Sequence, residues 1–182
     1  MEFVRLKHLA IMGIGEFWSR RVDVAGQSFS VFVDIQSRAN NDAIDVNIIV
    51  NDKVQYGRSH NSGIIDAAFI YNKGRFQSQP GRADKDFKLV SAHEFGHSVL
   101  DYFGGTKESW GHKGSTKVLL QSVKSTTAGF PNNGPIDLMM YYDTDKNYIP
   151  FSAEYSRTIA AEIDVKRLIW LSNLTFTNNT QR

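Results

Sequence analysis

The feature that most constrains this sequence is the pentapeptide His93-Glu94-Phe95-Gly96-His97. Two histidines four positions apart lie on one face of an α-helix, where their imidazoles can bind one ion. The neighbouring residues frame such a helix, because Asp84 can cap its beginning and Gly104-Gly105 can stop it after Phe103. We therefore predict a helix from Asp84 to Phe103 with both imidazoles on one side.

The remaining patterns predict an α+β fold. Segments with apolar residues at helical spacing occur beside segments of period two, which are typical of half-buried strands. These patterns predict a helix over 3–20, a hairpin over 22–35 that turns at 25–27, strands over 44–50 and 64–71, a helix over 153–172 and a polar tail over 175–182. We expect one domain over 1–182, in which a twisted mixed sheet of four or five strands packs on the apolar face of the His93 helix, namely Leu89, Ala92, Gly96, Val99 and Phe103.

The amino-acid composition limits which residues could bind a metal and which partners the protein could have. The chain has no cysteine, so a metal must be held by His, Asp, Glu or Tyr. Its 21 Lys and Arg residues are scattered among 19 Asp and Glu residues, which argues against nucleic acid as a partner. No stretch approaches the roughly 20 apolar residues of a membrane span, and Gly13 and Gly15 interrupt the first apolar run before it resembles a signal peptide. We therefore expect no nucleic acid partner, no membrane span and no classical export signal.

The two histidines and the glutamate between them predict a catalytic zinc site. Such a site has three protein ligands and one open position, and Zn²⁺ lowers the pKa of water there to about 7. Glu94 could act as general base toward that water and then as acid toward a leaving amine. A chance pentapeptide on a buried helix is the simpler alternative, but the chain has only five histidines. The motif therefore favours Zn²⁺ as cofactor, with His93 and His97 as ligands and Glu94 as the base.

Several residues compete for the third zinc ligand. His112 follows the predicted helix at a spacing that lets the chain return over the metal, and it is the preferred candidate. Glu108, in the same loop, would give a site with two histidines and one carboxylate. Asp101 lies one turn beyond the motif and is better suited to hold a ligating imidazole than to bind the metal. His60 is expected in a solvated loop, and His8 in a structural position on the first helix.

A second signal lies at Met139-Met140-Tyr141-Tyr142, in a loop region downstream of the helix. An HExxH helix followed by a Met-x-Tyr turn resembles the metzincin clan of zinc peptidases. The resemblance implies a zincin-like fold, in which Met140 lies in a turn beneath the metal and Tyr142 ligates it or stabilises the oxyanion. The sequence departs from that clan at Leu100, where its motif has glycine, and at Phe103, where it has the third ligand. The two methionines and two tyrosines could also be ordinary core filling under a loop.

Longer stretches resemble the zinc-peptidase toxin domains at the C-termini of bacterial polymorphic toxins and of Rhs-type effectors of type VI secretion. These stretches are Arg58-Ser59-His60-Asn61, 93–100, Gly104-Gly105 and 109–114, within a resemblance that spans roughly residues 18–142. The resemblance implies an antibacterial peptidase that is secreted or delivered into a target cell. It also implies a peptide or protein substrate and a cognate immunity protein as partners, and it supports His112 as the third ligand.

These observations together predict a zinc metalloendopeptidase with Zn²⁺ held by His93, His97 and His112. Glu94 would activate water and Tyr142 would stabilise the tetrahedral oxyanion. An extended substrate could add as a strand beside 64–71. Two alternatives stay open. One is a zinc-binding structural or interaction module without hydrolysis, whose closed site would not need Glu94. The other is a zinc amidase that acts on cell-wall peptides.

Overall fold

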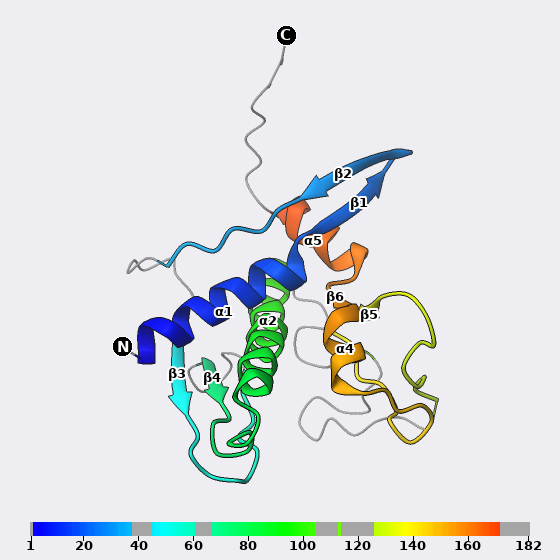
Figure 1. Ribbon diagram of the computed structural model, residues 1–182. Helices are drawn as coiled ribbons and strands as arrows, with labels where there is room; N and C mark the ends of the chain where they lie inside the picture. Colours follow the sequence, from blue (N-terminus) through cyan, green and yellow to red (C-terminus); the bar gives the residue numbers. More distant parts are fainter. Residues whose placement is uncertain (1, 38–44, 61–66, 105–112, 114–125, 172–182) are drawn as a thin grey trace.

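The computed structural model describes residues 2–37, 45–60, 67–104, 113 and 126–171, without the side chains of 101–104, 170 and 171 (Figure 1). The helices are α1 (Glu2–Trp18), α2 (Pro80–Gly104), α4 (Phe151–Arg157) and α5 (Glu162–Leu171), and the strands are β1 (Arg20–Val24), β2 (Gln27–Val31), β3 (Val46–Val50), β4 (Ala67–Tyr71), β5 (Ile136–Asp137) and β6 (Thr158–Ile159). The predicted α+β class is confirmed. None of the helices in these ranges is both long and apolar enough to cross a membrane.

The strands form three separate two-stranded sheets, so the predicted single sheet of four or five strands is wrong for the described ranges. β1 and β2 form the predicted antiparallel hairpin, in which Ala25 and Gly26 adopt φ values of 50° and 78°, as two-residue hairpin turns require. β3 pairs with β4 in parallel, and β5 with β6. The alternation of apolar and polar residues predicts that a segment is a strand, but it does not predict which strand it pairs with. Val22 is the only buried residue in β1 and β2. Among the described strands, β1 and β2 therefore pair only with each other and bury little beyond Val22.

Both edges of β4 are occupied. One edge pairs with β3, and the other faces residues 57–60. There His60 and Ala68 exchange backbone hydrogen bonds of 3.0 and 2.9 Å, and the Ile70 N–H donates to Ser59 Oγ at 2.8 Å. The expected addition of a substrate strand beside 64–71 is therefore wrong for the described part of that segment, because the N–H groups that a substrate would need are already bonded.

α1 and α2 pack directly on each other at the centre of the fold (Figure 1). Gly13 allows this close approach, since a Cβ at that position would overlap the backbone of Lys88. Trp18, at the end of α1, is fully buried and donates from Nε1 to the Ala92 carbonyl oxygen at 3.0 Å. α1 therefore fixes the position of the middle of α2, just where the predicted site begins.

Substitution of Gly13 by alanine should lower the free energy of unfolding by about 1–3 kcal/mol, because the added methyl group meets backbone rather than a movable side chain. Gly81→Ala is the matched control, since it also places a methyl group on a helix but meets no atom within 4 Å. Urea unfolding of both variants checks the prediction. Equal stability of the two variants would contradict the close contact between α1 and α2.

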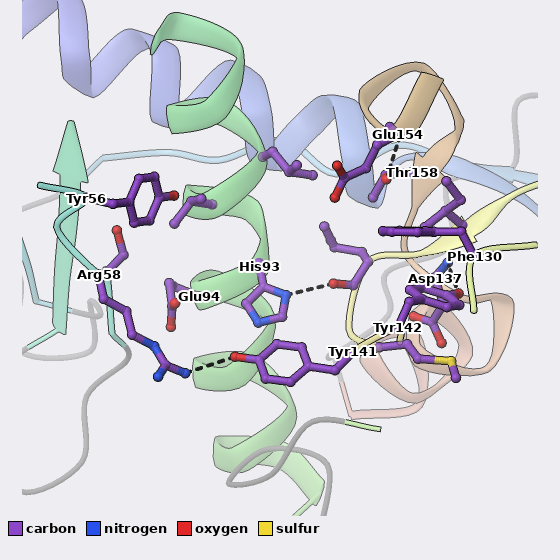
Figure 2. Close-up of a pocket in the computed structure, with 16 residues that line it drawn as sticks. Tyr56, Arg58, His93, Glu94, Phe130, Asp137, Tyr141, Tyr142, Glu154 and Thr158 are labelled. Atoms are coloured by element: carbon purple, nitrogen blue, oxygen red, sulfur yellow. Dashed lines mark hydrogen bonds between the residues drawn. The ribbon is translucent and has the colours of Figure 1, made fainter. Parts of the chain in front are cut away.

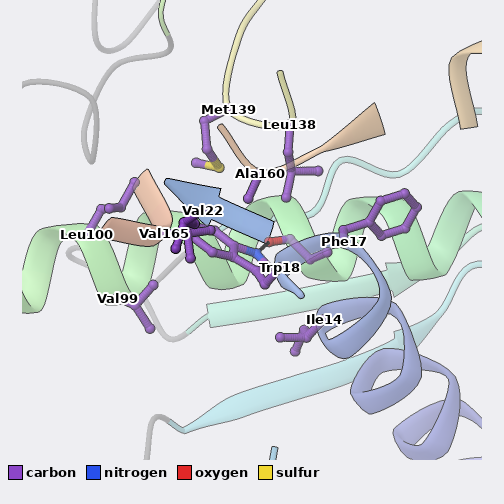
Figure 3. Packing of buried hydrophobic residues seen from close by; sticks show 11 residues of the cluster. Ile14, Phe17, Trp18, Val22, Val99, Leu100, Leu138, Met139, Ala160 and Val165 are labelled. Atoms are coloured by element: carbon purple, nitrogen blue, oxygen red, sulfur yellow. Dashed lines mark hydrogen bonds between the residues drawn. The ribbon is translucent and has the colours of Figure 1, made fainter. Parts of the chain in front are cut away.

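The apolar face of α2 packs differently from the expectation. Ala92 and Val99 belong to the main core, together with Trp18, Met139 and Val22 of the hairpin, and the buried residues of this core include none from β3 or β4 (Figure 3). β4 contacts an earlier stretch of α2 through a second core, which includes Ala83, Phe87, Phe69 and Tyr71. Different faces of α2 therefore contact β4 and the segment that carries Met139.

Two of the predicted helices differ from the structure, namely the helix from Asp84 to Phe103 and the helix over 153–172, whereas α1 lies within two residues of its prediction. α2 begins at Pro80 rather than at an Asp84 cap, because the missing N–H of proline needs no partner in a first helical turn. Asp84 instead accepts hydrogen bonds from Arg5 at 2.9 Å and Tyr71 at 2.8 Å. The predicted helix over 153–172 is interrupted, because Thr158 is extended (ψ 134°) and pairs with β5. The predicted tail over 175–182 lies outside the described residues.

Candidate functional site

His93 and His97 point their Nε2 atoms at each other across one turn of α2. The two Nε2 atoms are 3.2 Å apart, and the ring planes are inclined by 82°. Zinc bonds to imidazole nitrogen of about 2.0–2.1 Å in tetrahedral geometry place two such nitrogens roughly 3.3 Å apart. The pair therefore fits two corners of a zinc site. The same separation suits an N–H···N hydrogen bond, and measurement of bound metal distinguishes the two.

The environment of His93 favours the neutral imidazole that binds metals. Its Nδ1 lies 2.7 Å from the Leu138 carbonyl oxygen, so Nδ1 carries the hydrogen and Nε2 offers a lone pair. Burial lowers the pKa of the ring, and the positive charge of Arg58 lowers it further, whereas the Leu138 carbonyl opposes both. The backbone near Leu138 thus sets the tautomer and the orientation of the first imidazole.

The third ligand cannot be placed in the same way. His112 and Glu108 lie outside the described residues, and so does the side chain of Asp101, whose backbone belongs to α2. Within the described part of the chain, no three His, Cys, Asp or Glu side chains gather around one point. His60 is held by its backbone pairing with Ala68, and His8 is exposed on α1.

Lys113, which directly follows His112 in the sequence, is described and well anchored. Its carbonyl oxygen accepts the Tyr141 N–H at 2.8 Å. Its Nζ donates to Asp137 at 2.9 Å and to Asp164 at 2.7 Å, and the side chain of Asp164 is fully buried on α5. Lys113 therefore links three segments beside His93: its own, the turn after β5, and α5.

A tight turn over 137–140 lies beneath the histidine helix. The Met140 N–H donates to the Asp137 carbonyl oxygen at 3.2 Å, and the Met139 N–H donates to Asp137 Oδ1 at 2.9 Å. Met139 is fully buried, and its sulfur packs against Gly96, where a Cβ would overlap it. Met140 is half-buried and lines the adjoining cleft. It is thus Met139, and not Met140 as expected, whose side chain lies against the HExxH helix.

The tyrosines are shifted by one residue in the same way. The Tyr141 ring lies nearly parallel to the His93 ring, with 6.3 Å between centroids and 11° between planes, and its hydroxyl accepts from Arg58 Nη2 at 2.9 Å (Figure 2). The Tyr142 hydroxyl instead accepts the Asp137 N–H at 3.0 Å, and its ring stacks on Phe130. Tyr141, rather than Tyr142, is therefore the tyrosine beside the first imidazole.

Sequence reasoning assigned no role to Tyr141, and it named Arg58 only as part of a longer motif. The available signal was the spacing Met139-x-Tyr141, which is the same as that of Met140-x-Tyr142. Burial raises the pKa of the Tyr141 hydroxyl, Arg58 lowers it and Glu94 raises it again. The pKa stays raised overall, so the hydroxyl keeps its proton near neutral pH and can donate it in a hydrogen bond.

A cleft of about 470 Å³ opens along this side of α2. His93 and Glu94 line it from α2, Arg58 from the segment after β3, and Tyr141 from the turn (Figure 2). Its other walls are largely apolar and include Leu89, Val90, Phe130, Ile136, Leu138 and Met140, with Tyr56, Tyr142 and Glu154 as polar members. The cleft therefore combines a candidate base, an imidazole and a hydroxyl donor with room for part of a substrate.

Comparison of the chain with protein-family models, with curated proteins and with solved structures finds no match.

Proposed function

We propose that this chain is a zinc-dependent endopeptidase of the HExxH type, with a zincin-like arrangement around α2. The observation that carries the proposal is the 3.2 Å approach of the His93 and His97 Nε2 atoms beside a cleft that Glu94 also lines. Structural zinc sites are closed by four protein ligands, whereas hydrolytic sites keep an open position next to a base. A glutamate in an open cleft beside two paired imidazoles supports the hydrolytic alternative.

Each residue of the site has a distinct task in amide hydrolysis. A bound zinc ion supplies Lewis acidity, which polarises a carbonyl oxygen and lowers the pKa of water. Glu94 accepts a proton from water as the water oxygen attacks the scissile carbonyl carbon, and it then donates that proton to the nitrogen that leaves. Tyr141, held by Arg58, donates a hydrogen bond to the oxygen that becomes negative in the tetrahedral state.

We further propose that His112 is the third ligand. It directly precedes Lys113, whose backbone is bonded to Tyr141 and whose ammonium group is held by two carboxylates. Successive Cα atoms are 3.8 Å apart, so the anchoring of Lys113 favours its neighbour over Glu108, which is four residues more distant along the chain. Asp101, at the end of α2, is then left as a partner for a ligating imidazole.

Bound zinc in purified variants tests the metal site. We expect about one zinc ion per chain in the wild type, and loss of the ion in His93→Ala, His97→Ala and His112→Ala but not in Glu108→Ala. His8→Ala is the matched control, because His8 is exposed on α1. Elemental analysis after dialysis gives the content. Full zinc in His93→Ala and His97→Ala would contradict the proposed site, and loss in Glu108→Ala alone would replace His112 by Glu108.

The resemblance of several motifs to those of toxin domains supports a biological setting for this activity. We propose that the peptidase is delivered into a target bacterium, where it cleaves a protein or peptide and is restrained in the producing cell by an immunity protein. Expression in the cytoplasm and in the periplasm of a bacterium, with Glu94→Gln as the inactive control, tests this setting. Growth arrest that occurs with periplasmic expression but not with cytoplasmic expression would favour the cell-wall amidase alternative.

A further inference from the structure

We propose that Glu154 makes the cleft selective for substrates with a lysine or arginine near the scissile bond. This inference rests on the proposed peptidase function. Glu154 lies on α4, where it lines the same cleft as His93 and Glu94 and faces α2 from the opposite wall (Figure 2). A carboxylate in that place can meet the side chain of a substrate that is bound for cleavage.

The Glu154 carboxylate has no partner of its own in the described structure. No described hydrogen bond or ion pair involves its carboxylate oxygens, although its backbone oxygen accepts from Thr158 Oγ1 at 2.7 Å. The residue is half-buried, so water only partly compensates its charge. A carboxylate in this condition gains from a cation that brings its own hydrogen-bond donors.

Charges near Glu154 leave a negative excess around it, and two of them, Asp86 and Arg82, line a neighbouring pocket rather than this cleft. Asp86 on α2 acts on Glu154 as a like charge, and Arg82 as an opposite one. Burial is the largest cause that raises the pKa of Glu154, with Asp86 adding to it and Arg82 opposing it. Arg82 is itself placed between two rings, with its guanidinium carbon 5.3 Å from the Phe76 centroid and 5.0 Å from that of Phe151. Glu154 and Asp86 thus contribute two carboxylates near the single guanidinium of Arg82, which favours a cation over an anion.

The walls between the two ends of the cleft suit a long basic side chain. Val90 and Glu94, four residues apart on one face of α2, both line the cleft, and Asp86 lies one turn before Val90 on the same face. Val90 and its neighbour Leu89 line the cleft with aliphatic groups. The methylene stem of lysine or arginine can lie on such a surface while its charged group reaches a carboxylate. An acidic substrate residue would meet repulsion at the same place.

Cleavage of a diverse set of synthetic 14-residue peptides, followed by mass spectrometry, tests the selectivity. For the zinc-loaded wild type we expect sites flanked by lysine or arginine to be preferred. Glu154→Gln should lower kcat/KM at those sites by roughly 10- to 100-fold, as expected for loss of one charged hydrogen bond, and should leave neutral sites nearly unchanged. Glu154→Lys should shift the preference toward acidic residues. Asp145→Asn removes an exposed carboxylate and is the matched control.

Binding without turnover provides the second measurement. In the Glu94→Gln background, a labelled copy of the best substrate should bind more tightly than the same peptide with norleucine in place of lysine, and Glu154→Gln should remove the difference. Cleavage without a basic preference, or a preference that persists in Glu154→Gln, would overturn the role of Glu154 alone. A zinc-loaded wild type that cleaves no peptide would overturn the peptidase function and this inference with it.

Discussion

Replacement of Glu94 by glutamine should lower kcat/KM for peptide hydrolysis by about 10² to 10⁴-fold, while the fold and the bound zinc stay unchanged. Glutamine keeps the shape of the side chain but cannot accept the proton of water. Glu94 lines an open cleft on α2 rather than the core, so the exchange removes no packing. Initial rates with a fluorogenic peptide, zinc content and thermal unfolding of the same sample give the three readouts.

Asp145→Asn serves as the control for this substitution, because Asp145 is an exposed carboxylate on the loop after the candidate turn. It should retain wild-type rates. Hydrolysis by Glu94→Gln at the wild-type rate would contradict the role of Glu94 as base. If wild type and Glu94→Gln both retain zinc and the same fold, and neither hydrolyses peptides, the structural zinc module would be favoured instead.

The part of the site that depends on local geometry could be predicted from the sequence. Two histidines four residues apart share a helical face whatever the rest of the chain does, so the pairing of His93 and His97 follows once α2 is helical. The same holds for α1 and for the hairpin, whose turn needs two residues with positive φ at Ala25 and Gly26. In each case the interaction connects residues that are close in the sequence.

Pairings between distant segments could not be predicted. Alternation identified the strands, but nothing local indicates that residues 57–60 cover the second edge of β4. Nor does helical spacing over 153–172 reveal that Thr158 and Ile159 leave the helix to pair with β5. These outcomes depend on which backbone groups find partners in the folded protein, and that is a property of the whole chain.

The shift of one residue in the turn has a similar origin. Both residues of the Met-x-Tyr pattern occur twice in succession, as Met139-Met140 and Tyr141-Tyr142. The spacing therefore fits two registers equally well, Met139 with Tyr141 or Met140 with Tyr142. The two registers differ in three dimensions because the space that Gly96 leaves beside α2 is filled by the sulfur of Met139. Once Met139 is buried, Leu138 reaches His93 with its carbonyl oxygen and Tyr141 lies beside the same ring.

The two registers predict opposite results for the tyrosines. Tyr141→Phe should lower kcat by about 10² to 10³-fold with little change in KM, because its hydroxyl acts mainly on the charge that develops in the transition state. Arg58 holds that hydroxyl at 2.9 Å, so the loss is of a group already positioned for donation. Arg58→Lys should lower kcat in the same direction but less, since lysine keeps the charge and loses the planar donor geometry.

Tyr142→Phe should behave as a stability variant. Its hydroxyl accepts the Asp137 N–H at 3.0 Å and has no described contact with His93, so its removal should cost about 0.5–1.5 kcal/mol of unfolding free energy and leave kcat within a few-fold of wild type. Steady-state kinetics and urea unfolding of both variants separate the two registers. A large loss of kcat in Tyr142→Phe, with normal turnover in Tyr141→Phe, would restore the assignment that the sequence alone favoured.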